Sequence, residues 1–393
     1  MKSIYLSAPG LICCAGLNRD ELYESCLKGN RNGFVNQELP GGKKTPTGQI
    51  SASLTSCQNL SLWPPVYSGN TRIIRIIDAA LEQIHSTIEE ALSAYGPEKI
   101  GVCLGSCDNG SEGSLLSHKT FITGGAFPKD YHLGFQSASF PAEYIARKYG
   151  LKGPAFTIAT ACASGASAIV RGAELLKSGF CDAVIAGGAD IVSETVLLGF
   201  HALEALSEGP TNPFSKNRKG INLGEGAAFF LLDSRENGEI ELLGAGESAD
   251  AFHMTAPGPN GEGPAKAMKA ALVDAGIDNA RIGYVNLHGT GTELNDKTEA
   301  MAVKEVFGKD PPPASSTKPI TGHTLGAAGA LETAICWMVL KMKKGLPVHC
   351  WDGVKDEELV FHPNIPNFGA PDLCMNNNFA FGGCNVSLIL KRR

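Results

Sequence analysis

The sequence predicts an α/β protein built from two similar halves. Strand-like and helix-like runs alternate along the chain, and the order of these runs in the first half recurs in the second. The length of 393 residues also exceeds what a single hydrophobic core usually supports. We therefore expect two halves, residues 1–237 and 238–393, each a sheet covered by helices.

The first half begins with a strand and a loop between Ile4 and Leu17. A helix is expected from Asn18 to Gly29, because acidic residues occupy its first turn. Residues 30–70 are rich in Gly, Pro, Ser and Asn, which predicts a surface excursion. Thr71 to Tyr95 carries apolar residues at helical spacing and predicts one helix, and Lys99 to Ser106 predicts a strand.

The remainder of the first half contains the segment with the clearest chemistry. After a helix at Pro141 to Tyr149, the run from Phe156 to Gly179 indicates a strand, a tight turn at Cys162 and a helix of small residues. Asp182 to Ala189 predicts a further strand. Residues 211–233 predict a loop that leads into a strand at the edge of the sheet.

The second half repeats this order. Ile240 to Gly246 resembles the first strand, and Arg281 to Leu287 resembles the strand at Lys99 to Ser106. Ala314 to Lys344 repeats the strand, turn and small-residue helix that surround Cys162. Leu373 to Leu390 repeats the strands that follow. A duplication of an α/β unit over this long period predicts that the two halves pack together.

Composition excludes several functions. A net charge of −6 argues against nucleic acid as the main partner. Twelve cysteines without a regular framework indicate reduced thiols in a cytoplasmic protein, and no Cys/His cluster has the spacing of a metal site. The apolar run after Lys2 imitates a signal peptide, but Pro9-Gly10 interrupts it. No apolar stretch approaches the ~20 residues that span a bilayer.

Cys162 is a candidate nucleophile. A thiol at a helix N-terminus faces unpaired N–H groups and the positive end of the helix dipole, and both favour the thiolate. The alternative is a buried structural cysteine, since free cysteines are among the most buried residues. Partners elsewhere in the chain must decide between the two.

Three stretches of the second half offer such partners: His288 after an apolar strand, Lys318 and His323 before a helix of Gly and Ala, and Phe379 and Phe381 beside a glycine-rich turn. Each alone is compatible with an ordinary loop or turn residue. Equivalent turns of a duplicated α/β fold, however, converge at the carboxyl ends of the strands. We therefore expect Cys162 and the two histidines to meet.

These residues carry a family resemblance. The segments TACASGASAI, HGTGTELND, STKPITGHTLGAAGALE and FAFGGCN closely resemble the motif series of the β-ketoacyl-[acyl-carrier-protein] synthases, elongating condensing enzymes of the thiolase fold. The match runs from the first strand to the last, in order. The resemblance implies a thiolase-like α/β fold with two similar halves in a five-layered α-β-α-β-α arrangement.

The resemblance also implies an acyltransferase reaction. Cys162 would accept an acyl group from the phosphopantetheine arm of an acyl carrier protein, and no other cofactor is expected. His288 and His323 would stabilise the enolate formed when malonyl-carrier loses CO2, because developing negative charge needs aimed donors in a dry site. The resulting carbanion would attack the acyl group on Cys162.

Further residues match the family's motifs. Lys318 and Glu332 would lie behind His323, and Asp296 would support the loop after His288. The N–H groups of Cys162 and Phe381 would form an oxyanion hole. The remaining matches are a gate at Phe379 and Phe381, pantetheine contacts at Thr290 and Thr292, and an acyl pocket at Phe200 and Asp108.

Several positions depart from the family's usual pattern. Ala380 replaces a frequent Gly between the two gate phenylalanines, and Cys384 replaces a common Thr. Glu204 stands where a basic, carrier-contacting residue is frequent, which shifts the expected docking to Arg72, Arg75 or Lys129. Asp108 stands where an apolar residue or Gly commonly limits acyl length. Asp108 and Glu204 therefore favour a specialised polyketide or aryl-polyene pathway over housekeeping fatty acid synthesis.

Three other functions share some of these residues. A Cys/His hydrolase needs neither the second histidine nor Lys318. A thiolase would carry a second catalytic cysteine in the C-terminal glycine motif, where Cys384 lies. A chain-length partner subunit of a ketosynthase heterodimer would lack the nucleophile. The resemblance implies a dimer, formed either with a second copy or with such a chain-length partner.

Overall fold

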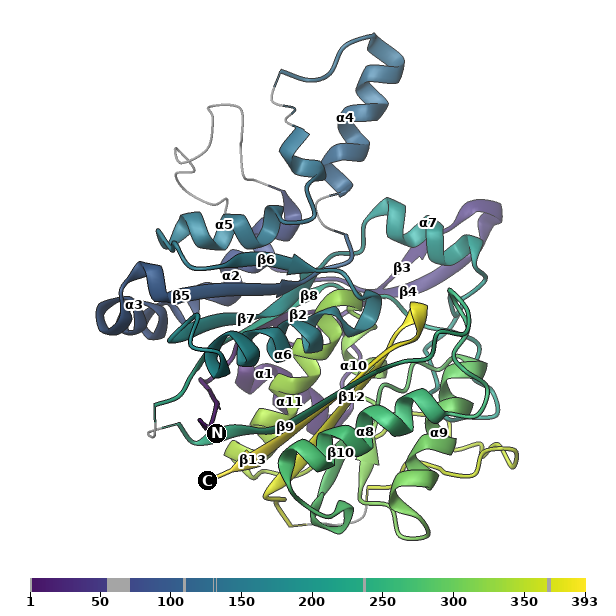
Figure 1. The fold of residues 1–393 in the computed structure, drawn as a ribbon. Coiled ribbons are helices and arrows are strands. Elements are labelled where there is room, and N and C mark those ends of the chain that lie inside the picture. Colours follow the sequence, from purple (N-terminus) through teal and green to yellow (C-terminus); the bar gives the residue numbers. More distant parts are fainter. Residues whose placement is uncertain are drawn as a thin grey trace.

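The computed structural model describes residues 2–54, 71–108, 111–129, 131, 133–235, 238–365 and 369–393. Figure 1 shows alternating layers of helices and strands. Two outer helical layers enclose two layers of strands, and a helical layer lies between the strands. The predicted thiolase-like fold in five layers is therefore confirmed.

The first half contributes one strand layer and its outer helices. Its strands are β1 (Tyr5–Leu6), β2 (Gly10–Cys13), β5 (Ile100–Gly105), β6 (Ala155–Ile158), β7 (Ala183–Asp190) and β8 (Gly226–Asp233), with a separate hairpin of β3 (Phe34–Glu38) and β4 (Lys44–Gly48). Its helices are α1 (Arg19–Lys28), α2 (Arg72–Glu82), α3 (His85–Tyr95), α4 (Ser111–Gly124), α5 (Phe140–Lys148), α6 (Ser164–Lys177) and α7 (Glu194–Ala202).

The second half repeats this plan in fewer elements. Its strands are β9 (Ile240–Ala249), β10 (Tyr284–Asn286), β11 (Ala314–Ser315), β12 (Leu373–Phe379) and β13 (Cys384–Arg392). Its helices are α8 (Glu262–Ala275), α9 (Glu293–Phe307), α10 (Lys318–Thr321) and α11 (Ala328–Met342).

The strand order shows the duplication directly. The first half runs β6-β5-β7-β8 and the second runs β11-β10-β12-β13, with two parallel pairings followed by an antiparallel one in each. The matching turns before α6 and α11 each contain a non-glycine residue with positive φ, Ala161 at 48° and Leu325 at 50°. The two halves therefore repeat even in an unusual backbone conformation.

Strand β1 joins the two halves. It pairs antiparallel with β8 on one side and with β9 on the other, so that one 11-stranded sheet runs through both halves. The boundary predicted after residue 237 lies between β8 and β9, and residues 236–237 are outside the described part of the chain. The division at that residue stays a prediction.

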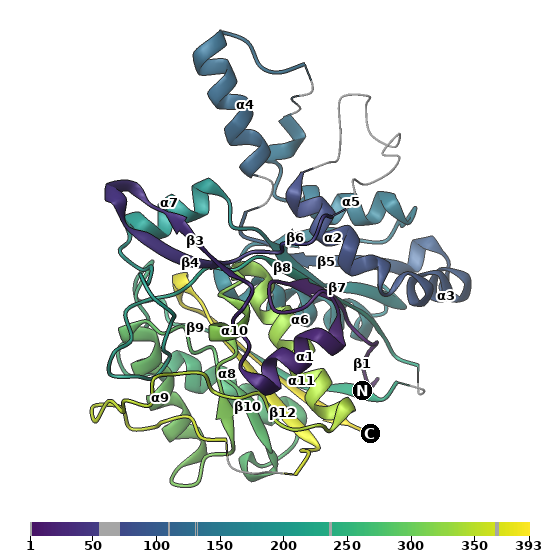
Figure 2. The same cartoon turned by 180° about the vertical axis from the view of Figure 1, so that it is seen from behind.

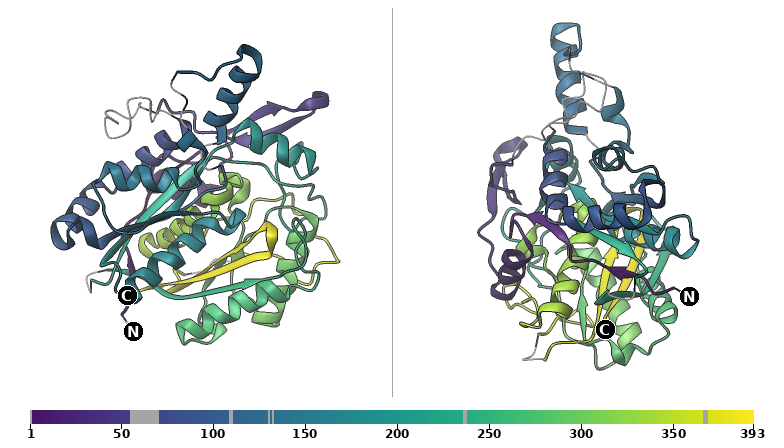
Figure 3. Two further views of the ribbon diagram at one scale, coloured as in Figure 1. Left: turned by 45° about the horizontal axis from the view of Figure 1, so that its top comes forward. Right: turned by 90° about the vertical axis from the view of Figure 1, so that its left-hand side faces the viewer.

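Three hydrophobic clusters fill the spaces between the layers. One packs α2, α3 and α5 against the outer face of the first strand layer, and another packs α8 and α9 against the second. The largest surrounds α6 and α11 between the strands. Figures 2 and 3 show these two helices enclosed at the centre from other directions.

The structure corrects several sequence predictions. The hairpin β3–β4 lies in the segment predicted as excursion, and residues 55–70 of that segment are outside the described residues. The helix predicted from Thr71 to Tyr95 is two helices, because the chain breaks at Gln83 and Ile84. Strand β8 is not an edge strand, since β1, β2 and β7 all pair with it.

One helical stretch resembles a membrane span by length and composition. Leu325–Met342 is apolar enough to cross a bilayer, but 89% of it is buried inside the fold. This stretch contains α11, which the other layers of the protein surround. It is therefore a core helix, and no other candidate span occurs in the described residues.

Helices α6 and α11 cross in backbone contact. A Cβ atom at Gly165 would lie 2.7 Å from the carbonyl oxygen of Gly326 and 2.9 Å from the nitrogen of Ala330. A Cβ atom at Gly329 would lie 2.6 Å from the nitrogen of Ala166. These glycines are required by the close approach of the helices.

We expect Gly165→Ala to lower the free energy of unfolding by about 1–3 kcal/mol, because the added methyl group forces the helices apart. Gly199 is the matched control, since it also lies in a helix but has no atom within 4 Å of the position that an added methyl group would take. Gly199→Ala should instead stabilise the protein by about 0.5–1 kcal/mol. Urea unfolding measures both, and equal shifts would contradict the close contact.

Candidate active site

Cys162 lies in a short 3₁₀ turn, Ala161–Ala163, between β6 and α6. The Ser164 side chain stabilises this turn, since its hydroxyl donates to the Ala161 oxygen at 2.6 Å and accepts from the Thr160 N–H at 2.9 Å. Ala161 has a φ of 48°, which is uncommon for a residue with a side chain. The turn thus holds the sulfur at the start of the central helix.

His288 follows β10 and is held by its backbone. Glu299 of α9 accepts the His288 N–H at 2.8 Å through one carboxylate oxygen and the Gly289 N–H at 2.7 Å through the other. Glu299 is buried, and burial raises its pKa to about 8. The bidentate contact fixes the first residues of the glycine-rich loop.

Asp296 supports the same loop, as predicted from its place in the motif. Its carboxylate accepts the N–H of Gly291 at 3.2 Å and that of Phe214 at 2.7 Å. Within the loop, the hydroxyls of Thr290 and Thr292 lie 2.9 Å apart. Both threonines line the cavity described below.

His323 follows α10 and pairs with the segment before β8. Its N–H donates to the Asn222 oxygen at 2.8 Å, and its oxygen accepts the Gly224 N–H at 3.0 Å. The Leu325 N–H donates to its Nδ1 atom at 3.3 Å. Because Nδ1 accepts, the ring proton resides on Nε2.

Lys318 and Glu332 form a buried ion pair behind the histidines. Both side chains are at most 3% exposed, and the Lys318 ammonium donates to one oxygen of the Glu332 carboxylate. Lys318 Nζ also lies 3.3 Å from Nδ1 of His288. The sequence placed this pair around His323, whereas the hydrogen bond goes to His288. An ammonium donor at Nδ1 leaves the ring proton on Nε2 of His288 as well.

Cys162, His288 and His323 converge. The cysteine sulfur and one ring nitrogen from each histidine lie within 4.8 Å of one another. The two imidazole rings are 5.4 Å apart and nearly perpendicular. All three side chains are buried at the inner end of a cavity of about 510 Å³. The convergence expected from the duplicated fold is therefore present in the structure.

All of the predicted site residues except Asp108 fall into two groups. Those that line the cavity are Cys162, Phe200, His288, Thr290, Thr292, His323, Phe379 and Phe381. Lys318, Glu332 and Asp296 lie behind them and hold their loops or rings. Lys318, Glu332 and Asp296 therefore act by positioning the residues that line the cavity.

Asp108 does not line this cavity. It is buried in the loop after β5, where its N–H donates to Asp190 at 2.8 Å and its carboxylate accepts the Ser111 hydroxyl at 2.6 Å. The preceding residue, Cys107, packs on the same small apolar cluster as Phe200. Asp108 is thus the next residue in the chain after one that packs on the cluster around Phe200, but it does not belong to that cluster itself.

Phe381 of the glycine-rich turn packs against Phe200 of α7, and the gate role of Phe379 and Phe381 stays a prediction. The rings of Phe381 and Phe200 stack 6.0 Å apart beside Cys162. The Phe381 backbone N–H lowers the pKa of the Cys162 thiol, against the larger effect of burial. The oxyanion hole that the sequence assigned to these two backbone positions stays a prediction.

Electrostatics keeps both histidines neutral. Burial and the charge of Lys318 lower the pKa of His288 and of His323 well below the ordinary range. Two neutral imidazoles with their protons on Nε2 are hydrogen-bond donors toward the cavity. Such a pair stabilises an oxyanion without itself carrying charge.

The Cys162 thiol differs from the sequence prediction. Burial raises its pKa to about 12, although the Lys318 charge and the Phe381 N–H act in the opposite direction. The position at a helix N-terminus predicted a thiolate, but desolvation is the larger effect because the residue is only 6% exposed. In the free site the thiol is therefore protonated.

Geometry alone would also allow a metal ion between these three side chains. The set is the only group of three such ligands found in the described residues. A cation there would face the buried Lys318 ammonium, and Cys162 would first have to lose its proton. An anionic oxygen of a substrate suits the surrounding charge better than a metal does.

Sequence reasoning missed Glu299 and Asn378. Glu299 lies one helical turn after Asp296, and this i,i+3 pair of acids near the start of α9 could have indicated that both side chains face the loop. Asn378 donates to Glu332 at 2.6 Å. No local pattern signals this contact, because β12 and α11 are distant in sequence.

A cysteine at a helix start, facing two neutral imidazole donors in a duplicated α/β fold, defines a thiolase-like enzyme that forms carbon–carbon bonds. Family models give the particular family. The beta-ketoacyl synthase N-terminal domain matches residues 47–237, and the beta-ketoacyl synthase C-terminal domain matches residues 240–349. The chain belongs to the β-ketoacyl synthase family, condensing enzymes of the acyltransferase class in fatty acid or polyketide biosynthesis.

Individual relatives agree with this assignment. 3-Oxoacyl-[acyl-carrier-protein] synthase 2 of Coxiella burnetii is 36% identical over 416 positions, covering 100% of this chain and 99% of that protein. Nodulation protein E of Rhizobium meliloti is 31% identical over 407 positions, with 100% and 99% coverage. A chain of the solved complex of ketosynthase ApeO with its chain length factor ApeC, from Xenorhabdus doucetiae, is 37% identical with a TM-score of 0.91, covering 100% of this chain and 98% of that chain.

The raised pKa of Cys162 predicts the pH dependence of its alkylation. Since its pKa is about 12, the thiolate fraction rises with pH throughout the accessible range. We expect the rate of iodoacetamide labelling at Cys162 to increase about tenfold per pH unit from about pH 7 upward. Peptide mass mapping with Cys162→Ala as the control measures it. A plateau near neutral pH would show a stabilised thiolate instead.

Proposed function

We propose that this chain is a β-ketoacyl-[acyl-carrier-protein] synthase that joins a Cys162-bound acyl group to malonyl-carrier in a decarboxylative Claisen condensation. The convergence of the Cys162 sulfur with the neutral rings of His288 and His323 carries this proposal. No protein-bound cofactor is required, because the substrates arrive on the phosphopantetheine arm of the carrier.

In the first step Cys162 becomes acylated. Its sulfur attacks the acyl thioester, and the carbonyl oxygen becomes an oxyanion that the N–H groups of Cys162 and Phe381 stabilise. The thiol proton passes to the departing pantetheine sulfur, which leaves as a thiol. A thioester on Cys162 replaces the one on the carrier.

In the second step malonyl-carrier enters the same cavity. The bond to its carboxylate breaks, CO2 leaves, and the electron pair becomes an enolate whose oxygen accepts hydrogen bonds from His288 and His323. The enolate carbon then attacks the acyl carbonyl, a carbon–carbon bond forms, and the Cys162 thiol is regenerated after it takes up a proton. The product is a 3-oxoacyl-carrier two carbons longer.

The cavity mouth suits a pantetheine arm. Thr290 and Thr292 supply hydroxyls along its wall, and Lys219 is a cation at the rim. Glu204 lies at the same rim. Of the predicted docking residues, Arg72 is occupied by a bidentate ion pair with Glu225, so we assign carrier contact to other cations.

We place the enzyme in a specialised pathway of the polyketide or aryl-polyene type. The similarity to two solved structures supports this. One is the ApeO–ApeC complex described above. The other is the ishigamide ketosynthase/chain length factor, which is 27% identical with a TM-score of 0.87, covering 100% of this chain and 99% of that chain. Asp108 supports this placement too, because it is a buried acid next in the chain to Cys107, which packs on the same apolar cluster as Phe200. The eleven described cysteines are free thiols, in agreement with a cytoplasmic location.

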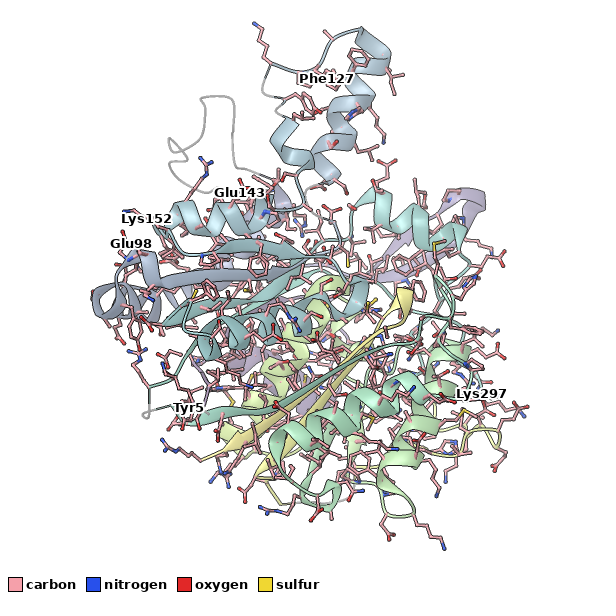
Figure 4. All side chains as sticks on the ribbon, viewed as in Figure 1. Tyr5, Glu98, Phe127, Glu143, Lys152 and Lys297 are labelled. Atoms are coloured by element: carbon pink, nitrogen blue, oxygen red, sulfur yellow. The ribbon has the colours of Figure 1, made fainter. Side chains whose placement is uncertain are left out.

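Two features of the first half support a partner chain of the same fold. Strand β6 ends the sheet, so its outer edge is open for pairing within the described chain. Helix α4 stands away from the body in Figures 1 and 3 and exposes apolar side chains, with Leu116 at 60% and Ile122 at 79%. The aromatic ring of Phe127, seen beside α4 in Figure 4, stacks on Phe121 at 4.6 Å. We propose that a second copy or a chain-length partner covers this face.

None of the three rival functions fits as well. Cys384, which a thiolase would use as a second catalytic thiol, does not line the cavity. A chain-length partner subunit would need neither Cys162 nor the two histidines. A hydrolase leaves the buried Lys318–Glu332 pair without a role.

The variant His323→Ala tests the proposed reaction directly. We expect malonyl-carrier decarboxylation to fall by about 10²–10³, because one donor to the enolate is lost, while acylation of Cys162 persists. Intact mass after incubation with a panel of acyl carriers measures acylation, and product analysis measures chain extension. Cys162→Ala is the control without an adduct. If His323→Ala lost acylation but kept decarboxylation, the assigned roles would be wrong.

The partner interface is tested by the sedimentation velocity of Ile122→Glu. We expect the wild type to contain two chains and the variant to dissociate, because a charge would be buried at the interface. Val273→Glu is the matched control, as Val273 is equally exposed at 80% but lies on α8. A monomeric wild type that pairs only with a chain-length subunit would exclude the homodimer. Dissociation by Val273→Glu alone would place the interface elsewhere.

A further inference from the structure

Strand β12 carries three consecutive asparagines, Asn376, Asn377 and Asn378, whose side chains are fully buried. Burying an amide is costly unless hydrogen bonds compensate it. Asn376 donates to Thr333 at 2.9 Å on α11, whereas Asn377 accepts from Ser387 at 2.8 Å on β13. Asn378 alone of the three reaches a charged group.

Asn378 completes the coordination of the buried carboxylate. Its Nδ2 donates to one oxygen of Glu332 at 2.6 Å, while the Lys318 ammonium occupies the other. Asn376 in turn donates to the Asn378 side-chain oxygen at 3.4 Å, which orients the amide. Both oxygens of Glu332 therefore have donors on the side away from the cavity.

This coordination controls the charge of the pair. Burial raises the pKa of Glu332, and Lys318 and the Asn378 hydrogen bond each lower it. A hydrogen bond to the ionised form favours that form. Without the Asn378 donor, Glu332 would take up a proton at a higher pH, and Lys318 would lose its counter-charge.

The charge of Lys318 also acts on His288. Lys318 contacts Nδ1 of His288 at 3.3 Å and therefore sets which ring nitrogen carries the proton. Ionised Glu332 keeps Lys318 as a donor, which leaves the His288 proton on Nε2. If Glu332 no longer held the Lys318 ammonium in place, no donor would fix the tautomer of His288, and the ring would lose its Nε2 donor toward the cavity.

We propose that Asn378 is a positioning residue for His288, acting through Glu332 and Lys318 without touching substrate. This inference rests on the condensing function proposed above. Asn378 lies on β12 directly before Phe379, the first of the two predicted gate phenylalanines. The proposal gives Asn378 a role in the malonyl half-reaction.

Other ionisable groups also face this chain of contacts. The charges of Glu332 and Lys318 both affect the pKa of Cys162. The charge of Lys318 also lowers the pKa of His288 and of His323. The charge of Lys318 also lowers the pKa of Glu299 on α9, against the larger effect of burial. Among the hydrogen bonds of the described residues, the Glu332 carboxylate receives only those from Lys318 and Asn378, so a change at Asn378 acts first on Glu332.

The test compares Asn378→Leu with Asn377→Leu, two nearly isosteric changes at neighbouring buried positions. We expect Asn378→Leu to lower malonyl decarboxylation roughly 10- to 100-fold, the range of one hydrogen bond to a charged group, with Cys162 acylation almost unchanged. The acidic limb of its pH–rate profile should move to higher pH. Asn377→Leu should keep the wild-type limb, and Asn378→Ser, which retains a donor, should show a smaller shift.

A second readout does not depend on the reaction. Ring ¹⁵N shifts of histidine-labelled protein report which nitrogen carries the proton, and His288→Gln identifies the His288 signals. We expect the Nε2–H form in the wild type and a loss of that form in Asn378→Leu. Unchanged His288 signals and an unchanged acidic limb in both Asn378 variants would overturn the inference. A wild type with the expected His288 signals but no decarboxylation would instead reject the proposed function alone.

Discussion

The backbone contact between α6 and α11 is the constraint on which the rest of the structure depends. Gly165 and Gly329 let the two helices meet without intervening side chains. Since Cys162 and His323 lie in the equivalent turns that precede these helices, the same contact brings nucleophile and imidazole together. Asp190 reinforces it by accepting N–H groups from Cys107 and Gly326, one from each half. The duplicated fold therefore creates a site that neither half contains.

Within that site, burial and a single buried cation together set the protonation state of the reacting groups. Lys318 lowers the pKa of both histidines and opposes the effect of burial on Cys162. Burying an ammonium is unfavourable, and Glu332 compensates for it although a second charge is thereby buried. Replacing the pair by apolar residues would be compatible with stability, but the histidines would lose the cation that adds to burial in lowering their pKa, and His288 would lose the donor that fixes its tautomer.

The sequence was sufficient for the features that depend on local pattern. Motif residues such as Cys162 and His288 were found, and so was the duplication, because the strand, turn and helix order is visible in the chain. It failed where tertiary contacts override local preference. The hairpin β3–β4 is polar and resembles a loop, and β8 has neighbours on both sides because β1 and β2, from the distant start of the chain, pair with it opposite β7. The hydrogen bond from Lys318 to His288 and the desolvation of Cys162 likewise depend on distant segments.

The protonated thiol has a consequence for how the two half-reactions are ordered. Forming a free thiolate in a site with a pKa of about 12 costs several kcal/mol at neutral pH. In the proposed reaction the proton therefore leaves as the sulfur attacks, when an acyl thioester is already seated. It passes to the departing pantetheine sulfur, so that both histidines are neutral donors when malonyl-carrier enters. A resting thiolate would compete for the same hydrogen bonds that the enolate needs, so burial of Cys162 reserves the His288 and His323 donors for the second substrate.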